Sequence, residues 1–177
     1  MAAAENFELL TGHCTCKTIT YSLLAPPLVT NCCHCTWCQR ETGSAFVINC
    51  CIESSNFKIT SDTSPTLVEL PSESGKGQLV ARCPNCFVAL YSHYPSTERW
   101  TTYVRAGTLA EGSRQKISPE VHVFAPNKVQ WLDLSGEKER GVPLYDEFYQ
   151  KEDVWREASL ERWQLLTKRR QAETSTE

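Results

Sequence analysis

Ten cysteines, most of them in three short clusters, constrain this 177-residue chain more than any other feature. Thiols in the cytosol stay reduced, whereas disulfide frameworks belong mainly to secreted proteins. The first residues, Met1 to Phe7, lack the positive start and the apolar stretch of a secretory signal. We therefore expect a cytoplasmic protein whose cysteines bind metal rather than form disulfides.

Two of the clusters are short cysteine pairs that lie far apart in the sequence. Cys14 and Cys16 precede a predicted strand, and Cys83 and Cys86 lie between two others. Structural zinc takes four tetrahedral ligands, and its sites commonly combine two such pairs. The four cysteines therefore predict a closed structural zinc site that ties two sheets together. The alternative is that they are merely buried small side chains.

The third cluster places Cys33, Cys35 and Cys38 within six residues and offers no equally obvious fourth ligand. Three protein ligands plus one exchangeable position are typical of catalytic zinc. The sequence thus predicts a second zinc ion, in an open site. The spacing also permits Cys32 in place of Cys33. A closed second site, completed by His34, Cys50 or Cys51, is a further alternative to packing roles for Cys50 and Cys51.

The composition fits one globular domain, with 41% hydrophobic and 22% charged residues. A net charge of -3 and a pI near 5.9 argue against a nucleic-acid-binding protein. No apolar run approaches the ~20 residues that a membrane span needs. We expect neither nucleic acid nor membrane as a partner, and the sequence leaves a homo-oligomer open.

Short segments rich in β-branched and aromatic residues predict a mainly β fold of packed antiparallel sheets. The predicted strands cover residues 18–23, 45–52, 78–82, 87–94 and 100–106. Residues 121–134 predict a strand, a turn and a second short strand.

The composition changes after residue 135. We therefore predict a zinc domain over residues 7–135, followed over 136–177 by a linker, an amphipathic helix and a tail. The helix is expected over residues 152–170. Its predicted apolar face, which we expect to brace the sheet rather than bind a partner protein, comprises Val154, Trp155, Ala158, Leu165 and Leu166.

Several motifs together resemble the glutathione-dependent formaldehyde-activating enzyme family, whose domain is shared with centromere protein V. The segment from Gly12 to Tyr21 is similar to the opening family motif Gly-x-Cys-x-Cys-Gly-x-Val-x-Tyr. Residues 33–40, Cys-His-Cys-x-x-Cys-Gln-Arg, followed by residues 42–46, Thr-Gly-Ser-Ala-Phe, resemble its central signature. Cys83-x-x-Cys86, residues 105–109, His122 and Trp131-Leu132 follow in the expected order. Lys17 departs from the family, which has glycine there, and this puts the turn conformation in doubt.

The resemblance covers about residues 7–134 and implies a zinc-bound β-tent with two zinc ions per chain. Cys14, Cys16, Cys83 and Cys86 would hold the structural ion. Cys33, preferred to Cys32 on this resemblance, would hold the catalytic ion with Cys35 and Cys38. Family members are similar to carbon–sulfur lyases that make or break S-hydroxymethylglutathione. The expected partners are thus a small thiol such as glutathione and an aldehyde or thiol conjugate.

We expect the substrate thiolate to take the open zinc position, since a dication stabilises the charged sulfur. Arg40, two residues past Cys38, is the candidate to bind a substrate carboxylate and to act in catalysis. His34 is the candidate proton shuttle, or else a hydrogen-bonding support for the ligands. Thr42 and Ser44 are candidate hydrogen-bond donors to substrate, although such residues usually only form turns.

Two other functions remain open at this point. The first is a non-enzymatic zinc module that binds another protein through the same fold. The second is methionine sulfoxide reduction, which would require a reactive cysteine outside the metal sites. His93 and His122 fall in predicted strands, where structural roles are expected.

Overall fold

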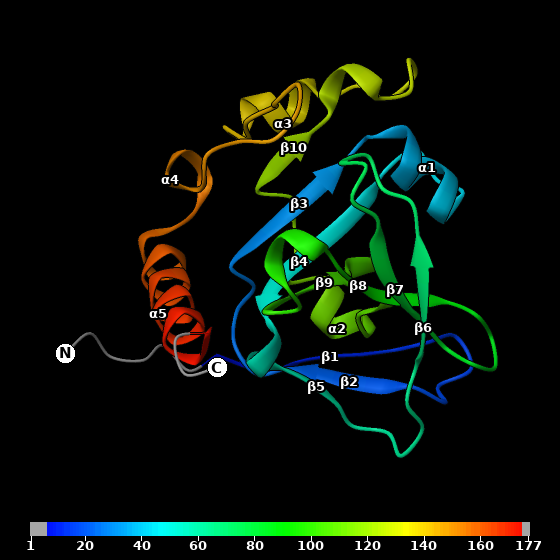
Figure 1. Ribbon diagram of the computed structural model, residues 1–177. Helices are drawn as coiled ribbons and strands as arrows, with labels where there is room; N and C mark the ends of the chain where they lie inside the picture. Colours follow the sequence, from blue (N-terminus) through cyan, green and yellow to red (C-terminus); the bar gives the residue numbers. More distant parts are fainter. Residues whose placement is uncertain (1–6, 175–177) are drawn as a thin grey trace.

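Two β-sheets of unequal size form the framework of the protein, which a computed structural model describes over residues 7–174 (Figure 1). The smaller sheet has the order β1-β2-β5 and the larger the order β10-β3-β4-β9-β8-β7-β6. The strands are β1 (Leu10–His13), β2 (Thr20–Leu23), β3 (Val29–Cys33), β4 (Val47–Glu53), β5 (Phe57–Ile59), β6 (Thr66–Leu70), β7 (Gln78–Arg82), β8 (Ala89–His93), β9 (Thr101–Arg105) and β10 (Val121–Val123). The α-helices are α1 (Thr36–Thr42), α2 (Glu111–Arg114), α3 (Ser135–Glu139), α4 (Lys151–Val154) and α5 (Glu157–Thr174). Four short 3-10 turns join them: η1 (Ser54–Asn56), η2 (Pro95–Thr97), η3 (Ala106–Thr108) and η4 (Ala125–Asn127).

One strand pair departs from the expected antiparallel pattern. β10 pairs with β3 in parallel, with His122 opposite Cys32, while the other strand pairs are antiparallel. A parallel pair needs a long crossover, and the chain returns to β3 only after passing through six other strands. The expectation of purely antiparallel sheets is therefore wrong at this edge. The fold is mixed α/β, with two antiparallel-rich sheets and a C-terminal helix.

The large sheet is covered differently on its two faces. Successive side chains of a strand point to opposite faces. In β4, Cys50 and Ile52 therefore join the core against the small sheet, together with Tyr21. Val47 and Cys51 point the other way, into a second core with residues of the C-terminal segment. One face of the large sheet thus packs against the small sheet. The other face contacts α1 and the C-terminal segment and lines a pocket.

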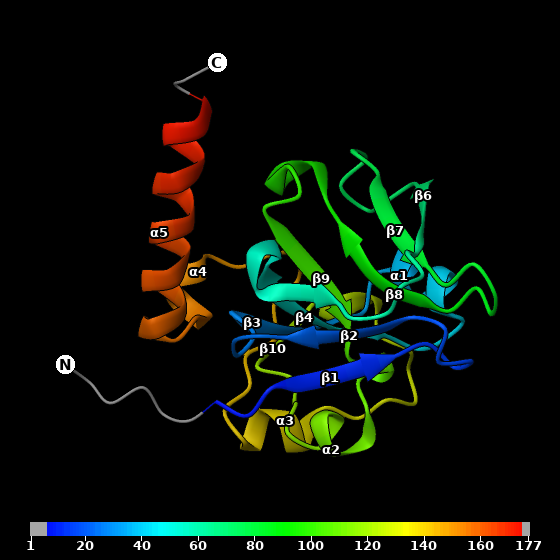
Figure 2. The same cartoon turned by 90° about the horizontal axis from the view of Figure 1, so that it is seen from below.

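The C-terminal helix lies beside the large sheet (Figure 2). It is separate from α4, because Trp155 between them has an extended backbone. This break shifts the buried face from the predicted one: Leu166 is buried, but Leu165 is 56% exposed and Ala158 is also exposed. Trp163 and Leu160 pack on the second core instead. The predicted boundary after residue 135 stays a prediction, and residues 175–177 of the predicted tail lie outside the described part of the chain.

The strand predictions also include one strand that the structure lacks and omit four that it has. Residues 129–134 contain a turn rather than a second strand, and Trp131 is 75% exposed there. Four strands were not predicted, namely β1, β3, β5 and β6. Within residues 7–174, no helix combines the length and the apolar character that crossing a bilayer requires.

The contact between Gly12 and Tyr21 gives a first prediction. The two residues are paired across β1 and β2, and a Cβ atom at position 12 would overlap the ring of Tyr21. That ring is 1% exposed, and its hydroxyl shares a 2.6 Å hydrogen bond with Thr108. We expect Gly12→Ala to lower the free energy of unfolding by about 1–3 kcal/mol, because the buried ring must move.

Gly112→Ala is the matched control, since a Cβ in α2 at that position meets nothing within 4 Å. We expect it to stabilise the protein by at most about 1 kcal/mol, because alanine favours helix over glycine. Chemical denaturation of the zinc-loaded protein measures both changes. Equal effects of the two substitutions would show that the ring does not constrain position 12.

Candidate metal centres

Four sulfurs meet where the two sheets approach each other. Cys14 and Cys16 follow β1 of the small sheet, whereas Cys83 and Cys86 lie between β7 and β8 of the large sheet. The four Sγ atoms lie within 4.8 Å of one another, and Cys16 Sγ is 3.5 Å from Cys14 Sγ and 3.6 Å from Cys83 Sγ. Thiolates bound tetrahedrally to zinc at about 2.3 Å would be separated by about 3.8 Å. The four-sulfur cluster therefore fits a zinc ion.

The backbone around this four-sulfur cluster turns in the same way at both cysteine pairs. Lys17 and Phe87, each next to the second cysteine of its pair, have φ angles of 61° and 58°. The amides of Ile19 and Asn85 donate to Cys14 Sγ at 3.3 Å and Cys83 Sγ at 3.4 Å. Positive φ is easiest for glycine, so Lys17 adopts here, at some cost, the conformation that glycine supports in the resembling motif. Lys17 in place of glycine therefore leaves the conformation of this turn unchanged.

Hydrogen bonds prepare one cysteine of this cluster for a thiolate state. Hydrogen bonds with the side chain and the backbone of Thr18 lower the pKa of Cys16 to about 6, whereas burial raises the pKa of Cys14 to about 11. A metal ion bound among the sulfurs would favour the deprotonated form of all four.

A second cluster contains Cys33, Cys35 and Cys38, which we call the cysteine trio. Their Sγ atoms lie within 4.8 Å of one another, and no further Cys, His, Asp or Glu ligand atom of residues 7–174 joins that group. Strand alternation explains why Cys33 belongs to it: Val29, Asn31 and Cys33 point from β3 to the pocket face. The trio supplies three soft ligands and fits zinc with one coordination position left over.

Helix α1 presents the other two sulfurs of the trio. Cys35 is the N-cap residue, and its Sγ accepts a hydrogen bond from the amide of Cys38 at 3.4 Å. Hydrogen bonds with the Cys33 and Cys38 thiols, and then with the amides of Cys38 and Trp37, lower the pKa of Cys35 to about 3. The helix ends at Gly43, whose φ of 63° suits glycine. A thiolate at the start of a helix also benefits from the helix dipole.

A buried ion-pair network holds α1 on the sheet. Glu41 accepts hydrogen bonds from Arg82 at 2.7 Å and from Arg105 at 3.1 Å, and its side chain is only 6% exposed. Arg105 also donates to Ser92 at 2.9 Å. Gln39 ties the other side of α1 to the backbone of His34 and Asn127. The position of Cys38 thus depends on charges that lie on two separate strands and one helix.

Cys32 lies on the opposite face of β3 from the trio. It is buried with His34 and His122, whose Nε2 and Nδ1 atoms share a 2.8 Å hydrogen bond. Two nitrogens bound to tetrahedral zinc at about 2.05 Å would be about 3.3 Å apart, so this spacing is that of a hydrogen bond. The structure therefore groups Cys33, and not Cys32, with Cys35 and Cys38.

His34 does not lie where a proton shuttle for the trio would be expected. Its side chain is 0% exposed and is absent from the lining of the pocket described below. Burial, followed by the effect of His122, lowers the pKa of His34 to about 4, so the imidazole is neutral near pH 7. Its contacts are those of a structural support next to two ligands.

The predicted substrate-binding residues lie on α1 and just after it, outside the lining of the pocket. The Arg40 guanidinium lies 6.0 Å from the ring of Trp37, which does line the pocket. Thr42 donates its hydroxyl to the carbonyl of Cys38 at 2.8 Å, and Ser44 is exposed. The structure does not bring these side chains together with the trio, and their roles in substrate binding stay predictions.

Cys50 and Cys51 are buried on opposite faces of β4 and join neither sulfur cluster. Burial raises the pKa of each thiol to about 12. They are therefore protonated packing residues, which does not support the methionine sulfoxide reductase alternative.

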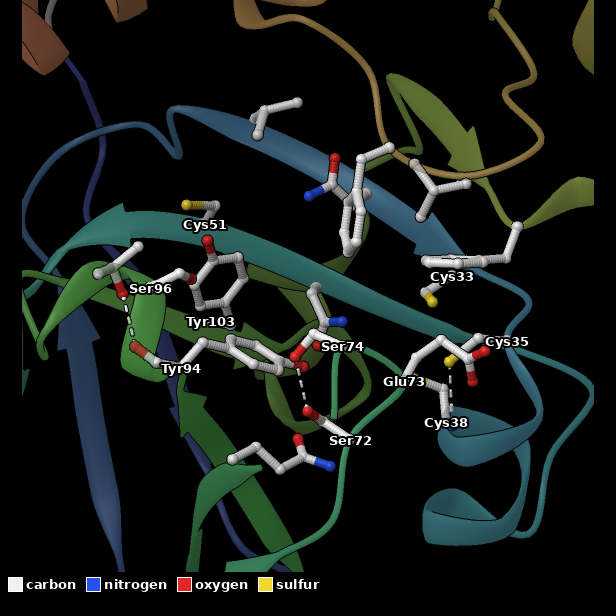
Figure 3. A pocket seen from close by; sticks show the side chains of 18 of the residues that line it. Cys33, Cys35, Cys38, Cys51, Ser72, Glu73, Ser74, Tyr94, Ser96 and Tyr103 are labelled. Atoms are coloured by element: carbon white, nitrogen blue, oxygen red, sulfur yellow. Dashed lines mark hydrogen bonds between the residues drawn. The ribbon is translucent and has the colours of Figure 1, made fainter. Parts of the chain in front are cut away.

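A pocket of about 460 Å³ opens beside the trio, which occupies one end of it (Figure 3). Its floor is the face of the large sheet that carries Asn31, Asn49 and Tyr103. The loop between β6 and β7 and the segment around η2 form two sides. A third side comes from the C-terminal segment, through Phe148, Tyr149, Lys151, Trp155 and Trp163.

Sequence reasoning missed the residues that support the trio and line the pocket beside it. Arg105 and Gln39 lie within the quoted motifs, but their partners are far away in the sequence. Of the aromatic residues between 148 and 163, only Trp155 was assigned a role, in the packing face of the predicted helix. Their close spacing next to a predicted helix is the one signal that could have drawn attention to them.

The comparison with protein families gives a match, which covers both cysteine clusters. The family described as glutathione-dependent formaldehyde-activating enzyme matches residues 9–127, which include all seven cysteines of the two clusters. A crystal structure of a Rhodobacter sphaeroides protein from a structural genomics programme is 12% identical, with a TM-score of 0.41. The match covers 76% of this chain and 98% of that chain. The comparison with curated proteins gives no match.

The family match spans more than half of the chain and contains both cysteine clusters in their motifs. The protein belongs to the glutathione-dependent formaldehyde-activating enzyme family.

Proposed function

We propose that this protein is a zinc-dependent carbon–sulfur lyase that acts on the adduct of an aldehyde with glutathione or a related thiol. One observation carries the proposal: three sulfur ligands lie at the end of an accessible pocket, and no fourth ligand atom from residues 7–174 joins them. A purely structural zinc site is closed by four protein ligands, whereas a catalytic one keeps a position open. The family match over residues 9–127 supports the same chemistry.

The proposed reaction breaks a hydroxymethyl-type thioether. The carbon–sulfur bond breaks with its electron pair on sulfur, and the oxygen of the adduct forms the aldehyde carbonyl as its hydroxyl proton passes to water. The reverse reaction adds a thiol sulfur to the aldehyde carbon. Zinc bound by the trio would supply a position for the substrate sulfur and stabilise its thiolate form.

The protein's own residues hold this site in place. Cys33 is fixed by strand β3, and Cys35 and Cys38 are fixed by the start of α1. Cys14, Cys16, Cys83 and Cys86 would hold the second, structural zinc ion, and the two sheets that they join would form the zinc-bound β-tent of the family. We assign His34 a positioning role, since it contacts His122 rather than the pocket.

Substitution of one cysteine in each cluster separates the two proposed roles. We expect Cys86→Ser to unfold or aggregate the protein, because structural zinc contributes ~10–16 kcal/mol of apparent binding free energy to folding. We expect Cys35→Ser to remain folded, because serine can also cap α1. This variant should contain about one zinc ion per chain instead of about two and should lose lyase turnover.

Metal analysis, far-UV circular dichroism and aldehyde release from a hydroxymethyl thiol adduct measure these outcomes. Aldehyde release must be compared with the uncatalysed rate, which the adduct shows without protein. Equal unfolding of the two variants would contradict the division into structural and catalytic sites. A wild-type protein that releases aldehyde only at the uncatalysed rate would favour the non-enzymatic zinc module.

The network around Glu41 gives a further prediction about α1. Glu41→Gln removes the charge that pairs with Arg105, which is only 5% exposed. Breaking a buried pair in this way costs about 3–5 kcal/mol of stability. We also expect a lower turnover at saturating substrate, because α1 would no longer hold Cys35 and Cys38 in place.

Glu69→Gln is the control, since Glu69 is an exposed glutamate of strand β6. Its effect on stability should stay within about 0.5 kcal/mol. Thermal unfolding and steady-state kinetics of the two variants test the idea. A Glu41→Gln protein with wild-type stability and turnover would show that the network does not position the helix.

A further inference from the structure

The pocket beside the trio is much larger than the smallest aldehyde substrate requires. Its volume of about 460 Å³ lies within the range of sites for drug-sized ligands. Formaldehyde has only two non-hydrogen atoms, so most of the space must be filled by the part of the substrate that carries the sulfur. The character of the lining should therefore indicate the chemistry of that thiol.

Eight of the side chains that line the pocket are aromatic. They include Tyr94, Tyr103, Phe148, Tyr149, Trp155 and Trp163. The charged residues of the lining are Glu73, Lys76 and Lys151. The ammonium group of Lys151 already lies 4.8 Å from the ring centroid of Trp163 and 5.9 Å from that of Trp155.

This lining is a poor match for glutathione. Glutathione carries two carboxylates and one ammonium group at neutral pH, and burying a charge without a partner is costly. Of the three charged lining residues, Glu73 and Lys76 are exposed, and an ion pair at an exposed position is screened by water and contributes little. The ammonium of Lys151 already lies over the ring of Trp163. Bidentate recognition of carboxylates usually comes from arginine, and none of the arginines in the described part of the chain lines the pocket. Aromatic walls instead favour a flat apolar group, which can stack on the rings or meet them edge to face.

The C-terminal part of this wall is fixed in place. The Tyr149 hydroxyl donates to Asn31 Oδ1 at 2.7 Å and accepts a hydrogen bond from Trp155 Nε1 at 3.1 Å. The ring of Trp155 meets that of Trp163 edge to face at a centroid distance of 5.6 Å. Asn31 is only two residues from Cys33 on the same face of β3. The wall is therefore coupled directly to the strand that supplies one of the proposed ligands.

Contacts with the rest of the chain hold α5 in position behind this wall. Arg162 forms an ion pair with Glu53 and donates to the carbonyl of Pro26 at 2.7 Å. Arg156 donates to the carbonyl of Pro27 at 2.6 Å. All of the wall residues from Phe148 to Trp163 lie beyond residue 127, where the family match ends. This segment therefore gives the chain a pocket wall that is additional to the matched domain.

We infer that the C-terminal segment determines substrate specificity and selects a thiol with an aromatic or similarly flat apolar group in preference to glutathione. The ring of the substrate would pack against Trp163 and Phe148 while its sulfur reaches the trio. This inference rests on the proposed function, because it assumes that a thiol enters the pocket sulfur first.

The test compares two thiols on the full-length, zinc-loaded protein. Benzyl mercaptan carries one ring and no charged substituent, whereas glutathione carries its three charged groups. Isothermal titration calorimetry gives a dissociation constant for each. We expect benzyl mercaptan to bind at least about tenfold more tightly, and Trp163→Ala to weaken its binding about tenfold while changing glutathione binding less than about twofold.

Two further variants control for folding. Phe148 is 68% exposed, so Phe148→Ala should leave the fold intact and still weaken benzyl mercaptan binding by about threefold. Leu165 is 56% exposed on α5, the helix that carries Trp163, and is not part of the pocket lining. Leu165→Ala should therefore leave the binding of both thiols unchanged.

The outcomes distinguish this inference from the proposed function. Glutathione binding equal to or tighter than that of benzyl mercaptan would overturn the inference. So would wild-type benzyl mercaptan affinity in both the Trp163→Ala and Phe148→Ala proteins. In either case a loss of thiol binding in Cys35→Ser would leave the proposed function standing. If neither thiol binds the wild-type protein, or if Cys35→Ser binds both normally, the proposed function fails together with the inference.

Discussion

The alternation of side chains along β3 and β4 is the constraint on which the rest of the structure depends. Because neighbouring residues of a strand face opposite sides, Cys50 enters the core against the small sheet while Cys51 faces the pocket. The same rule separates Cys32 from Cys33. A shift of β3 by one residue would turn the sulfur of Cys33 away from the pocket and bring that of Cys32 to the pocket face. The apolar core therefore fixes the register of the strand that carries the proposed catalytic ligand.

The two cysteine clusters differ in how the chain surrounds them. The four-sulfur cluster joins two turns with the same backbone conformation, one from each sheet, and needs nothing further for a complete tetrahedral site. The trio depends on a helix start, on the Glu41 ion pairs and on the hydrogen-bonded pair of His34 and His122. An incomplete ligand set needs such support, because its fourth position contributes nothing to holding the others together.

Much of the local structure could be predicted from the sequence. The features that depend on contacts between residues far apart in the chain could not. Residues 78–82 were predicted as a strand and form β7 with the same bounds, because the pattern there is local. β3 was not predicted, since its cysteines drew attention as ligands rather than as part of a strand. Its parallel pairing with β10 depends on the path of the whole chain. The apolar face of the C-terminal helix was misplaced because Trp155 interrupts the helical periodicity.

The candidate site shows the same limit. The grouping of the cysteines followed from their spacing, but the roles given to His34 and Arg40 rested on nearness in sequence. In the structure His34 points away from the pocket and Arg40 lies outside its lining. The residues that do line it, such as Tyr103 and Trp163, come from segments that only the folded chain brings together.

X-ray absorption at the zinc edge tests the central claim, an open position at the cysteine trio, most directly. For the zinc-loaded protein without thiol we expect about three and a half sulfur ligands per zinc, the mean of a four-sulfur and a three-sulfur site. Saturation with a thiol that binds should raise this value to about four. A mean of four sulfurs in the absence of thiol, or a value that thiol does not change, would contradict the account.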